Sequence, residues 1–426
     1  MPDWERHAIW WQVYPLGFTG ADEHPAHRLT RISGWLDYAV DLGVSGLAFG
    51  PIFAASTHGY DTVDHFRIDP RLGDLEDFRS LLAAAHERGL KVLLDGAFNH
   101  VGRDHPAFRQ VLELGPDAPQ AGWFRLRWRS AAEPEYDTFE GHRELVALNH
   151  DNPAVADHVS AVLAYWLQIG VDGWRLDAAY AVPPPFWARV LPRVRAAFPQ
   201  LYAFGEVIHG DYADIVRAST MDSVTQYELW KAIWSSLNDR NFFELAWALQ
   251  RHNGFLEHFV PLTFLGNHDV TRLASRLEDA RFLEHALVLL MTLGGTPTVY
   301  YGDEQAFAGI KEDRAGGDDV IRPAFPDAPA GLAPYGWWYY RLHQQLIGLR
   351  RRHGWLHAAR TEQLHLTNTG IAYAATAAGE RLVVALNLAP APLAVPAPEV
   401  SDVLAGAASL QDGDLNVRPY GWAILR

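Results

Sequence analysis

Four short motifs place acidic, basic and histidine side chains directly after apolar, strand-like runs. DGAFNH contains Asp95, Asn99 and His100, GWRLD contains Arg175 and Asp177, FGEV contains Glu206, and GNHD contains His268 and Asp269. A single Asp or Asn after a strand is typical of a turn or a helix N-cap. Four such motifs in succession instead favour a shared site at one edge of a sheet.

Two of these motifs contain carboxylates suited to different chemical roles. Arg175 and Asp177 are two residues apart on one strand, so their side chains leave the same face and can touch. The guanidinium favours an ionised Asp177, as a nucleophile requires, although a purely structural ion pair is the alternative. Glu206 follows the apolar run YAFG, and apolar surroundings favour the protonated form of a general acid. Two carboxyl groups about 5 Å apart with these roles cleave glycosidic bonds with retention. A solvated carboxylate at the strand end is the alternative for Glu206.

Other chemistries find less support. His100, His268, Asp95 and Asp269 are of metal-ligating types, but they form no compact ligand spacing, so we expect no metal site and expect the histidines to hydrogen-bond hydroxyl groups. The absence of cysteine excludes disulfides and thiolate sites. A formal net charge of -15 without a Lys/Arg-rich run argues against nucleic acid. Neither a signal sequence nor an apolar run of about 20 residues is visible, so we expect a cytoplasmic protein that does not bind membranes.

The elements that must position these residues alternate between strands and helices. Eight strand-like runs occur near Trp11, Val44, Lys91, Asp172, Tyr202, Asp222, Pro261 and Thr296. Segments such as LEDFRSLLAAAHERG (75–89) have apolar residues at helical spacing and a terminal Gly. This alternation predicts an α/β fold, a (β/α)8 TIM barrel, in which the strand ends carry the active site.

Two segments depart from the alternation. Residues 101–155 are rich in Pro, Gly, Trp and charge, and predict a small subdomain inserted after the third strand. Residues 354–426 alternate apolar and polar positions without helices, which predicts a C-terminal antiparallel β-sandwich domain. The catalytic barrel is then formed by residues 1–100 and 156–353.

The four motifs, in this order, resemble those of the α-amylase family of glycoside hydrolases. The resemblance implies that Asp177 is the nucleophile, Glu206 the acid/base, and Asp269 the residue that steadies the distorted sugar. It also implies that Arg175, His100 and His268 hold the nucleophile or the sugar hydroxyls, and that Asp95 and Asn99 support the site.

Further segments extend the resemblance through the barrel. THGYDTVDHFRIDPRLG (57–73) is similar to the family segment whose tyrosine, here Tyr60, stacks under the sugar, and DVIRPAF places Arg322 near the cleft. Tyr180, in the segment AAYAV after the nucleophile, stands where many relatives have Lys, and either stacks on a sugar or fills space. Ala181 stands where many have His, so the resemblance implies that calcium, though compatible with the fold, is not essential and that no cofactor is needed.

The sequence looks most like cyclomaltodextrinase, neopullulanase and maltogenic-amylase relatives. We therefore expect a hydrolase of mainly α-1,4 and also α-1,6 bonds in small linear or cyclic maltooligosaccharides, with a homodimer left open. One alternative is a transglycosylase or a trehalose-synthase-like isomerase, which passes the same intermediate to a sugar hydroxyl. Another is a non-catalytic sugar-binding relative, because a fold does not guarantee activity.

Overall fold

The computed structural model describes residues 3–130, 133–314, 316–396, 399–411 and 413–426. Its centre is a sheet of eight parallel strands that follow one another around a barrel in chain order. The strands are β1 (Trp10–Val13), β2 (Gly46–Phe49), β5 (Lys91–Ala97), β11 (Gly173–Asp177), β12 (Tyr202–Gly205), β13 (Ser223–Val224), β14 (Leu262–Phe264) and β15 (Thr296–Tyr300). A parallel bridge between Thr225 and Leu262 joins β13 to β14. All eight predicted runs form these strands, which confirms the barrel.

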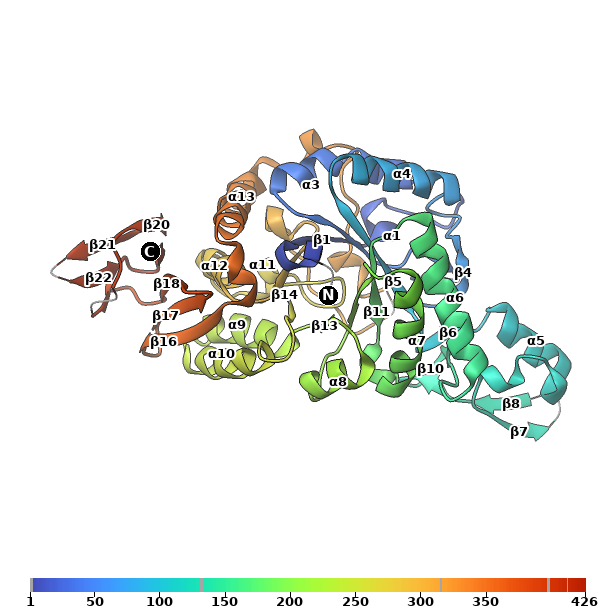
Figure 1. Ribbon diagram of the computed structural model, residues 1–426. Helices are drawn as coiled ribbons and strands as arrows, with labels where there is room; N and C mark the ends of the chain where they lie inside the picture. Colours follow the sequence, from blue (N-terminus) through green and yellow to red (C-terminus); the bar gives the residue numbers. More distant parts are fainter. Residues whose placement is uncertain (1–2, 131–132, 315, 397–398, 412) are drawn as a thin grey trace.

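Helices surround the strands (Figure 1). The longer ones are α3 (Leu36–Leu42), α4 (Leu75–Glu87), α6 (Pro153–Ile169), α7 (Pro184–Ala197), α8 (Tyr212–Ser219), α9 (Tyr227–Asn238), α10 (Phe243–Phe255), α12 (Leu283–Thr292) and α13 (Trp337–Arg352); α1 (Pro15–Phe18), α2 (Leu29–Ser33) and α11 (Leu273–Arg276) are short. The helix predicted within 75–89 is α4. It begins with a capping box between Asp74 and Asp77, and Gly89 follows its end with a φ of 75°. Because helices cover the outside and side chains fill the inside, the barrel strands are buried on both faces.

Aromatic side chains fill the end of the barrel where the strands begin. Trp10 on β1 and Tyr202 on β12 stack with ring centroids 6.4 Å apart, and Trp4 packs edge-on against both rings. Beside them, Thr296 donates a 2.9 Å hydrogen bond to the buried carboxylate of Glu5. This end of the barrel is therefore closed, which leaves the carboxyl ends of the strands for a substrate.

Short elements follow β5 where the sequence showed little periodicity. They are β6 (His100–Gly102), α5 (Pro106–Leu114), β7 (Leu126–Ser130), β8 (Glu133–Tyr136), β9 (Thr138–Phe139) and β10 (His142–Ala147). β10 pairs with both β6 and β9, and β7 pairs with β8. Strands this short carry too few residues for a repeat, so their pairing partners rather than an apolar pattern specify them.

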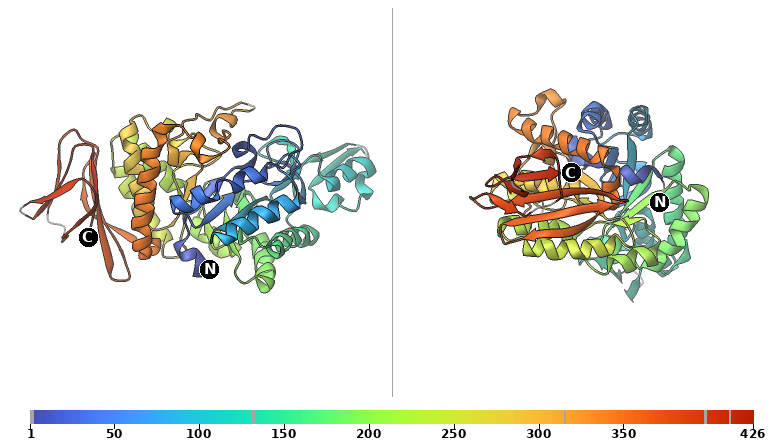
Figure 2. Two further views of the ribbon diagram at one scale, coloured as in Figure 1. Left: turned by 90° about the horizontal axis from the view of Figure 1, so that it is seen from above. Right: turned by 60° about the vertical axis from the view of Figure 1, so that its left-hand side comes forward.

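The C-terminal part forms two antiparallel sheets, as predicted. One contains β16 (Arg360–Leu366), β17 (Gly370–Ala377), β18 (Glu380–Asn387), β23 (Trp422–Leu425) and β20 (Val403–Gly406), and the other contains β19 (Leu393–Val395), β22 (Asp414–Val417) and β21 (Ala408–Gln411). Ala372, Val383 and Ala423 of the first sheet share an apolar core with Val395, Leu415 and Val417 of the second. These sheets and the β7–β8 hairpin lie on opposite sides of the barrel (Figure 2). Among the described residues, no helix has the length and apolarity to cross a lipid bilayer.

Candidate active site

The predicted site residues meet at the carboxyl ends of four barrel strands. Asp95 lies on β5 and His100 shortly after it, while Arg175 and Asp177 lie on β11. Glu206 follows β12 directly, and His268 and Asp269 follow β14. Because neighbouring parallel strands end at the same edge, residues more than 100 positions apart become neighbours.

The guanidinium of Arg175 connects three carboxylates. Its Nη1 donates to Asp95 Oδ2 over 2.6 Å and to Asp177 Oδ1 over 3.1 Å, and its Nη2 lies 2.9 Å from Glu206 Oε1. The Arg175 side chain is 5% exposed. The predicted contact between Arg175 and Asp177 is thus present, and the same cation places Asp177 and Glu206 on its two terminal nitrogens, facing a common space.

The backbone after Asp177 is adapted to this arrangement. Ala178 has φ 46° and ψ 37°, in the left-handed region that costs a non-glycine residue roughly 1–2 kcal/mol. Its amide donates to Glu206 Oε2 over 3.1 Å. The strained backbone at Ala178 therefore points its amide toward the Glu206 carboxylate.

The surroundings of Glu206 differ from the apolar environment that its preceding run suggests. Its carboxylate contacts Arg175, accepts from the Ala178 amide, and accepts a 3.3 Å bond from the Tyr227 hydroxyl. Asn267 in turn donates to that hydroxyl over 2.8 Å. Tyr202 and Phe204 of β12 pack inside the barrel below the site, whereas Glu206 follows the strand at its polar end. Tyr227, at the start of α9, carries no motif signal and was missed by sequence reasoning.

The charges of this cluster do not balance. Burial raises the pKa of Asp177 well above its ordinary value, the neighbouring carboxylates raise it further, and Arg175 opposes the shift. Burial likewise raises the pKa of Asp95 against the effect of Arg175. Arg175 therefore favours an ionised Asp177, as the sequence suggests, whereas burial and the neighbouring carboxylates oppose its ionisation.

A second polar network surrounds His268, which follows β14. The Tyr60 hydroxyl donates to Asp95 over 2.9 Å and also contacts His268 Nε2. Gln12 of β1, also missed from the sequence, donates to His268 Nδ1 over 3.2 Å. The rings of Tyr60 and His268 stack at 5.6 Å. This network fixes the orientation of the imidazole.

Asp269 is held by two cationic or polar neighbours. Arg322 Nη2 donates to its Oδ1 over 2.9 Å, and His268 Nε2 lies 3.0 Å from its Oδ2. Although burial opposes the shift, His268, Arg322 and Arg175 lower the pKa of Asp269 far below its ordinary value. Asp269 is therefore a fixed negative charge across the site from Asp177 and Glu206.

These groups open onto a cleft of about 1010 Å³, a size that accepts a short oligosaccharide. Seven of the predicted residues line it: Tyr60, His100, Asp177, Tyr180, Glu206, Asp269 and Arg322. Asp95, Arg175 and His268 lie behind them and bond to them. Asn99 instead lines a neighbouring hollow, and its amide donates to His100 Nδ1 over 3.3 Å. Burial lowers the pKa of His100 to about 4, although a hydrogen bond with the Tyr60 backbone opposes this shift.

Tyr180 closes one side of the cleft together with the inserted segment. Its hydroxyl donates to Glu140 Oε1 over 2.8 Å, and its ring lies 6.4 Å from that of Phe139. Phe139 stacks on His100 at 4.8 Å. Tyr180 therefore lines the cleft with an aromatic face while its polar end joins the barrel to the β9–β10 turn.

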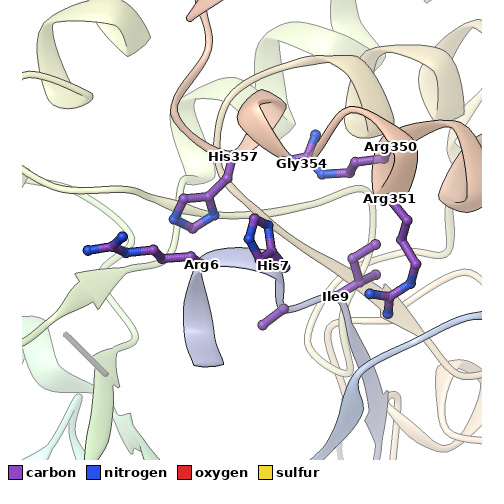
Figure 3. Close-up of a pocket in the computed structure, with 8 residues that line it drawn as sticks. Arg6, His7, Ile9, Arg350, Arg351, Gly354 and His357 are labelled. Carbon is purple, nitrogen blue, oxygen red and sulfur yellow. The ribbon is translucent and has the colours of Figure 1, made fainter. Parts of the chain in front are cut away.

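A smaller cavity of about 280 Å³ lies at the opposite end of the barrel (Figure 3). Its lining is basic, apolar or glycine: Arg6, His7, Ala8, Ile9, Arg350, Arg351, Gly354 and His357. The Arg350 guanidinium donates to the carbonyls of Met291, Leu293 and Gly295, so it caps main-chain carbonyls. Because this lining offers no pair of carboxylates, the cleft at the other end is the candidate active site.

Comparison with known proteins agrees with this geometry. A model of the alpha amylase catalytic domain matches residues 12–328. The chain is 30% identical to a cyclomaltodextrinase of Geobacillus thermopakistaniensis over 99% of this chain and 77% of that protein. It is 32% identical to a maltogenic alpha-amylase of Bacillus acidopullulyticus over 72% of this chain, and the match spans 58% of that relative's length.

A solved structure is similar over the full chain. It is the cyclic α-maltosyl-(1→6)-maltose hydrolase of Arthrobacter globiformis in complex with its cyclic tetrasaccharide, with a TM-score of 0.85, 28% identity, and coverage of 100% of this chain and 99% of that one. Together with the catalytic-domain match over most of the barrel, these similarities show that the chain belongs to the alpha-amylase family.

Proposed function

We propose that this protein is a retaining glycoside hydrolase that cleaves α-1,4 bonds, and also α-1,6 bonds, in small linear or cyclic maltooligosaccharides. One observation carries the proposal: a single guanidinium holds Asp177 and Glu206 at the floor of the cleft, with Asp269 opposite. The relatives are named for activity on cyclomaltodextrins and on cyclic maltosyl-maltose, which supports this substrate class.

The proposed reaction has two steps. Asp177 attacks the anomeric carbon as the glycosidic bond breaks, and Glu206 gives its proton to the departing oxygen. Glu206, now ionised, then takes a proton from water as that water displaces Asp177 from the sugar. Because Asp269 stays negatively charged, it stabilises the positive charge that develops on the sugar ring in both steps.

The remaining side chains have proposed binding roles. His100 donates to a sugar hydroxyl, His268 holds Asp269, and Tyr60 stacks under the ring that is cleaved. Arg175 and Arg322 hold the acidic side chains in place, while Asp95 and Asn99 orient Arg175 and His100. Tyr180 contacts the leaving part of the substrate.

Product analysis tests the proposal. We expect incubation with maltotriose, β-cyclodextrin, pullulan, panose and the mixed-linkage cyclic tetrasaccharide to yield glucose and maltose, with the α-anomer formed first in an NMR time course, and we expect trehalose, which has an α-1,1 bond, to stay intact. Asp177→Asn, which keeps the side-chain shape, is the inactive control. An initial β-anomer would refute retention, and accumulation of longer sugars or trehalose with little glucose or maltose would assign a transglycosylase or an isomerase. Sugar binding without turnover would assign a binding protein.

A further inference from the structure

Three histidines outside the cleft converge between the barrel and the inserted segment. His65 lies on β4 (Thr62–Ile68), which pairs with β3 (Phe53–Ala55); His105 is the N-cap of α5; and His158 lies on α6. One ring nitrogen from each lies within 4.8 Å of the others. The three segments are far apart in the sequence, so only the fold brings these side chains together.

The hydrogen bonds of the cluster leave lone pairs unused. His65 Nε2 donates to the Ala97 carbonyl over 3.0 Å, which leaves its Nδ1 unprotonated and, in the structure, buried without a partner. His158 Nε2 is likewise buried without a partner. A histidine that donates one N–H to a carbonyl and turns its other nitrogen into a shared space is the usual arrangement of a metal ligand.

Electrostatics also favour ligation. Burial lowers the pKa of His65 to about 3 and that of His105 to about 4, and it lowers the pKa of His158. All three imidazoles are therefore neutral near pH 7, as metal binding requires. Asp64 is the negative charge that acts on His158.

The ring geometry is close to that of a metal site. The centroids of His65 and His158 lie 5.8 Å apart, and that of His105 lies 6.3 Å from each. Their planes differ by 56° to 86°, so the rings do not stack on one another. Tetrahedral zinc with Zn–N bonds of about 2.0 Å places such centroids about 5 Å apart. Ligation requires the rings to approach by roughly 1 Å.

We infer that His65, His105 and His158 form a zinc-binding site that ties α5 of the inserted segment to β4 and α6 of the barrel. Imidazole ligands select a transition metal such as Zn²⁺ over Ca²⁺, and three of them leave the fourth position to water. His105 Nδ1 accepts a long 3.3 Å bond from the Ala107 amide. Ligation through its Nε2 moves the ring proton to Nδ1 and gives up that bond.

Metal analysis tests this inference. Protein treated with a chelator is mixed with Zn²⁺, passed over a desalting column, and analysed for bound zinc by mass spectrometry. We expect one equivalent of zinc, a melting temperature that rises by a few degrees, and, with Co²⁺ in place of zinc, the visible absorption of a tetrahedral site.

Matched variants assign the site. His65→Phe keeps the stack on Phe98, and His158→Phe changes a partly exposed position, so the second variant carries the test if the first does not fold. Both should lose the zinc and the thermal shift. His27→Ala removes a histidine from an exposed cluster with Asp74 and Asp77 and should retain both. Absence of bound zinc in the parent protein, zinc retained by the Phe variants, or zinc lost in His27→Ala would overturn the inference.

Discussion

Replacement of Glu206 by Gln tests the division of labour between the two carboxyl groups. The amide cannot deliver a proton to a departing sugar oxygen, and general acid catalysis contributes about 10²- to 10⁴-fold. We expect kcat for maltotriose to fall about 10³-fold or more. Sugar binding should persist, because Asp177 and Asp269 keep their contacts with Arg175 and Arg322.

The structural cost of the same substitution is small. Glu206 Oε1 faces Arg175 and Tyr227, whereas Oε2 faces the Ala178 amide, so one of these donors will meet the new NH2 group. Loss of one such bond costs about 1–3 kcal/mol. The variant should therefore fold, which thermal melting checks before any rate is compared.

A substrate with an activated leaving group separates catalysis from misfolding. The fluoride ion of maltosyl fluoride departs without a proton, so cleavage of this substrate by Glu206→Gln should stay within about tenfold of the parent rate. Equal losses on both substrates would refute the assigned roles.

Three further substitutions test other parts of the structure. Tyr180→Phe removes the solvent-exposed hydrogen bond to Glu140 and should raise the KM for maltotriose about fivefold, equivalent to about 1 kcal/mol, with little change in kcat. Arg272→Met leaves Asp303 buried without its 2.8 Å partner and should lower the free energy of unfolding in urea by about 3–5 kcal/mol. Burial raises the pKa of Glu304 from 4.5 to about 7. Because the folded protein favours the protonated carboxyl, the free energy of unfolding falls as the pH rises through that range. The total loss is about 3 kcal/mol at about pH 8. Glu304→Gln should flatten the decline of the melting temperature between about pH 5 and about pH 8.

Each of these three has an internal control. Glu140→Gln should reproduce the effect of Tyr180→Phe, and a change confined to kcat would contradict a binding role. Adding Asp303→Asn to Arg272→Met should recover part of the lost stability, whereas a further loss would show that the ion pair is not the cause. A pH profile of melting that Glu304→Gln leaves unchanged would show that another group carries the dependence.

The catalytic strands were predictable because a parallel barrel imposes a simple rule. Each strand of a βαβ unit ends at the same edge, so polar residues after β5, β11, β12 and β14 had to meet. The pair Arg175 and Asp177 followed from the two-residue period of a strand. Neither argument requires knowledge of distant contacts.

The supporting residues could not be predicted in the same way. Gln12 and Tyr227 touch the site only because closure of the barrel brings β1 beside β15 and α9 beside Glu206. Nothing local distinguishes either residue from a core or surface side chain. The strand β6 has the same origin, since residues 145–147 of β10, distant in the sequence, pair with it.

The sharing of Arg175 by three acids identifies what controls the site. The sequence predicted that Arg175 neutralises one carboxylate, whereas in the structure it contacts Asp95, Asp177 and Glu206. All four side chains are at least nine-tenths buried. Three ionised acids beside one cation would leave uncompensated negative charge away from water, which costs several kcal/mol. A retained proton relieves that cost. The proposed reaction starts with a proton on Glu206 and an ionised Asp177, so the burial that disfavours three ionised acids also favours a cluster that retains that one proton.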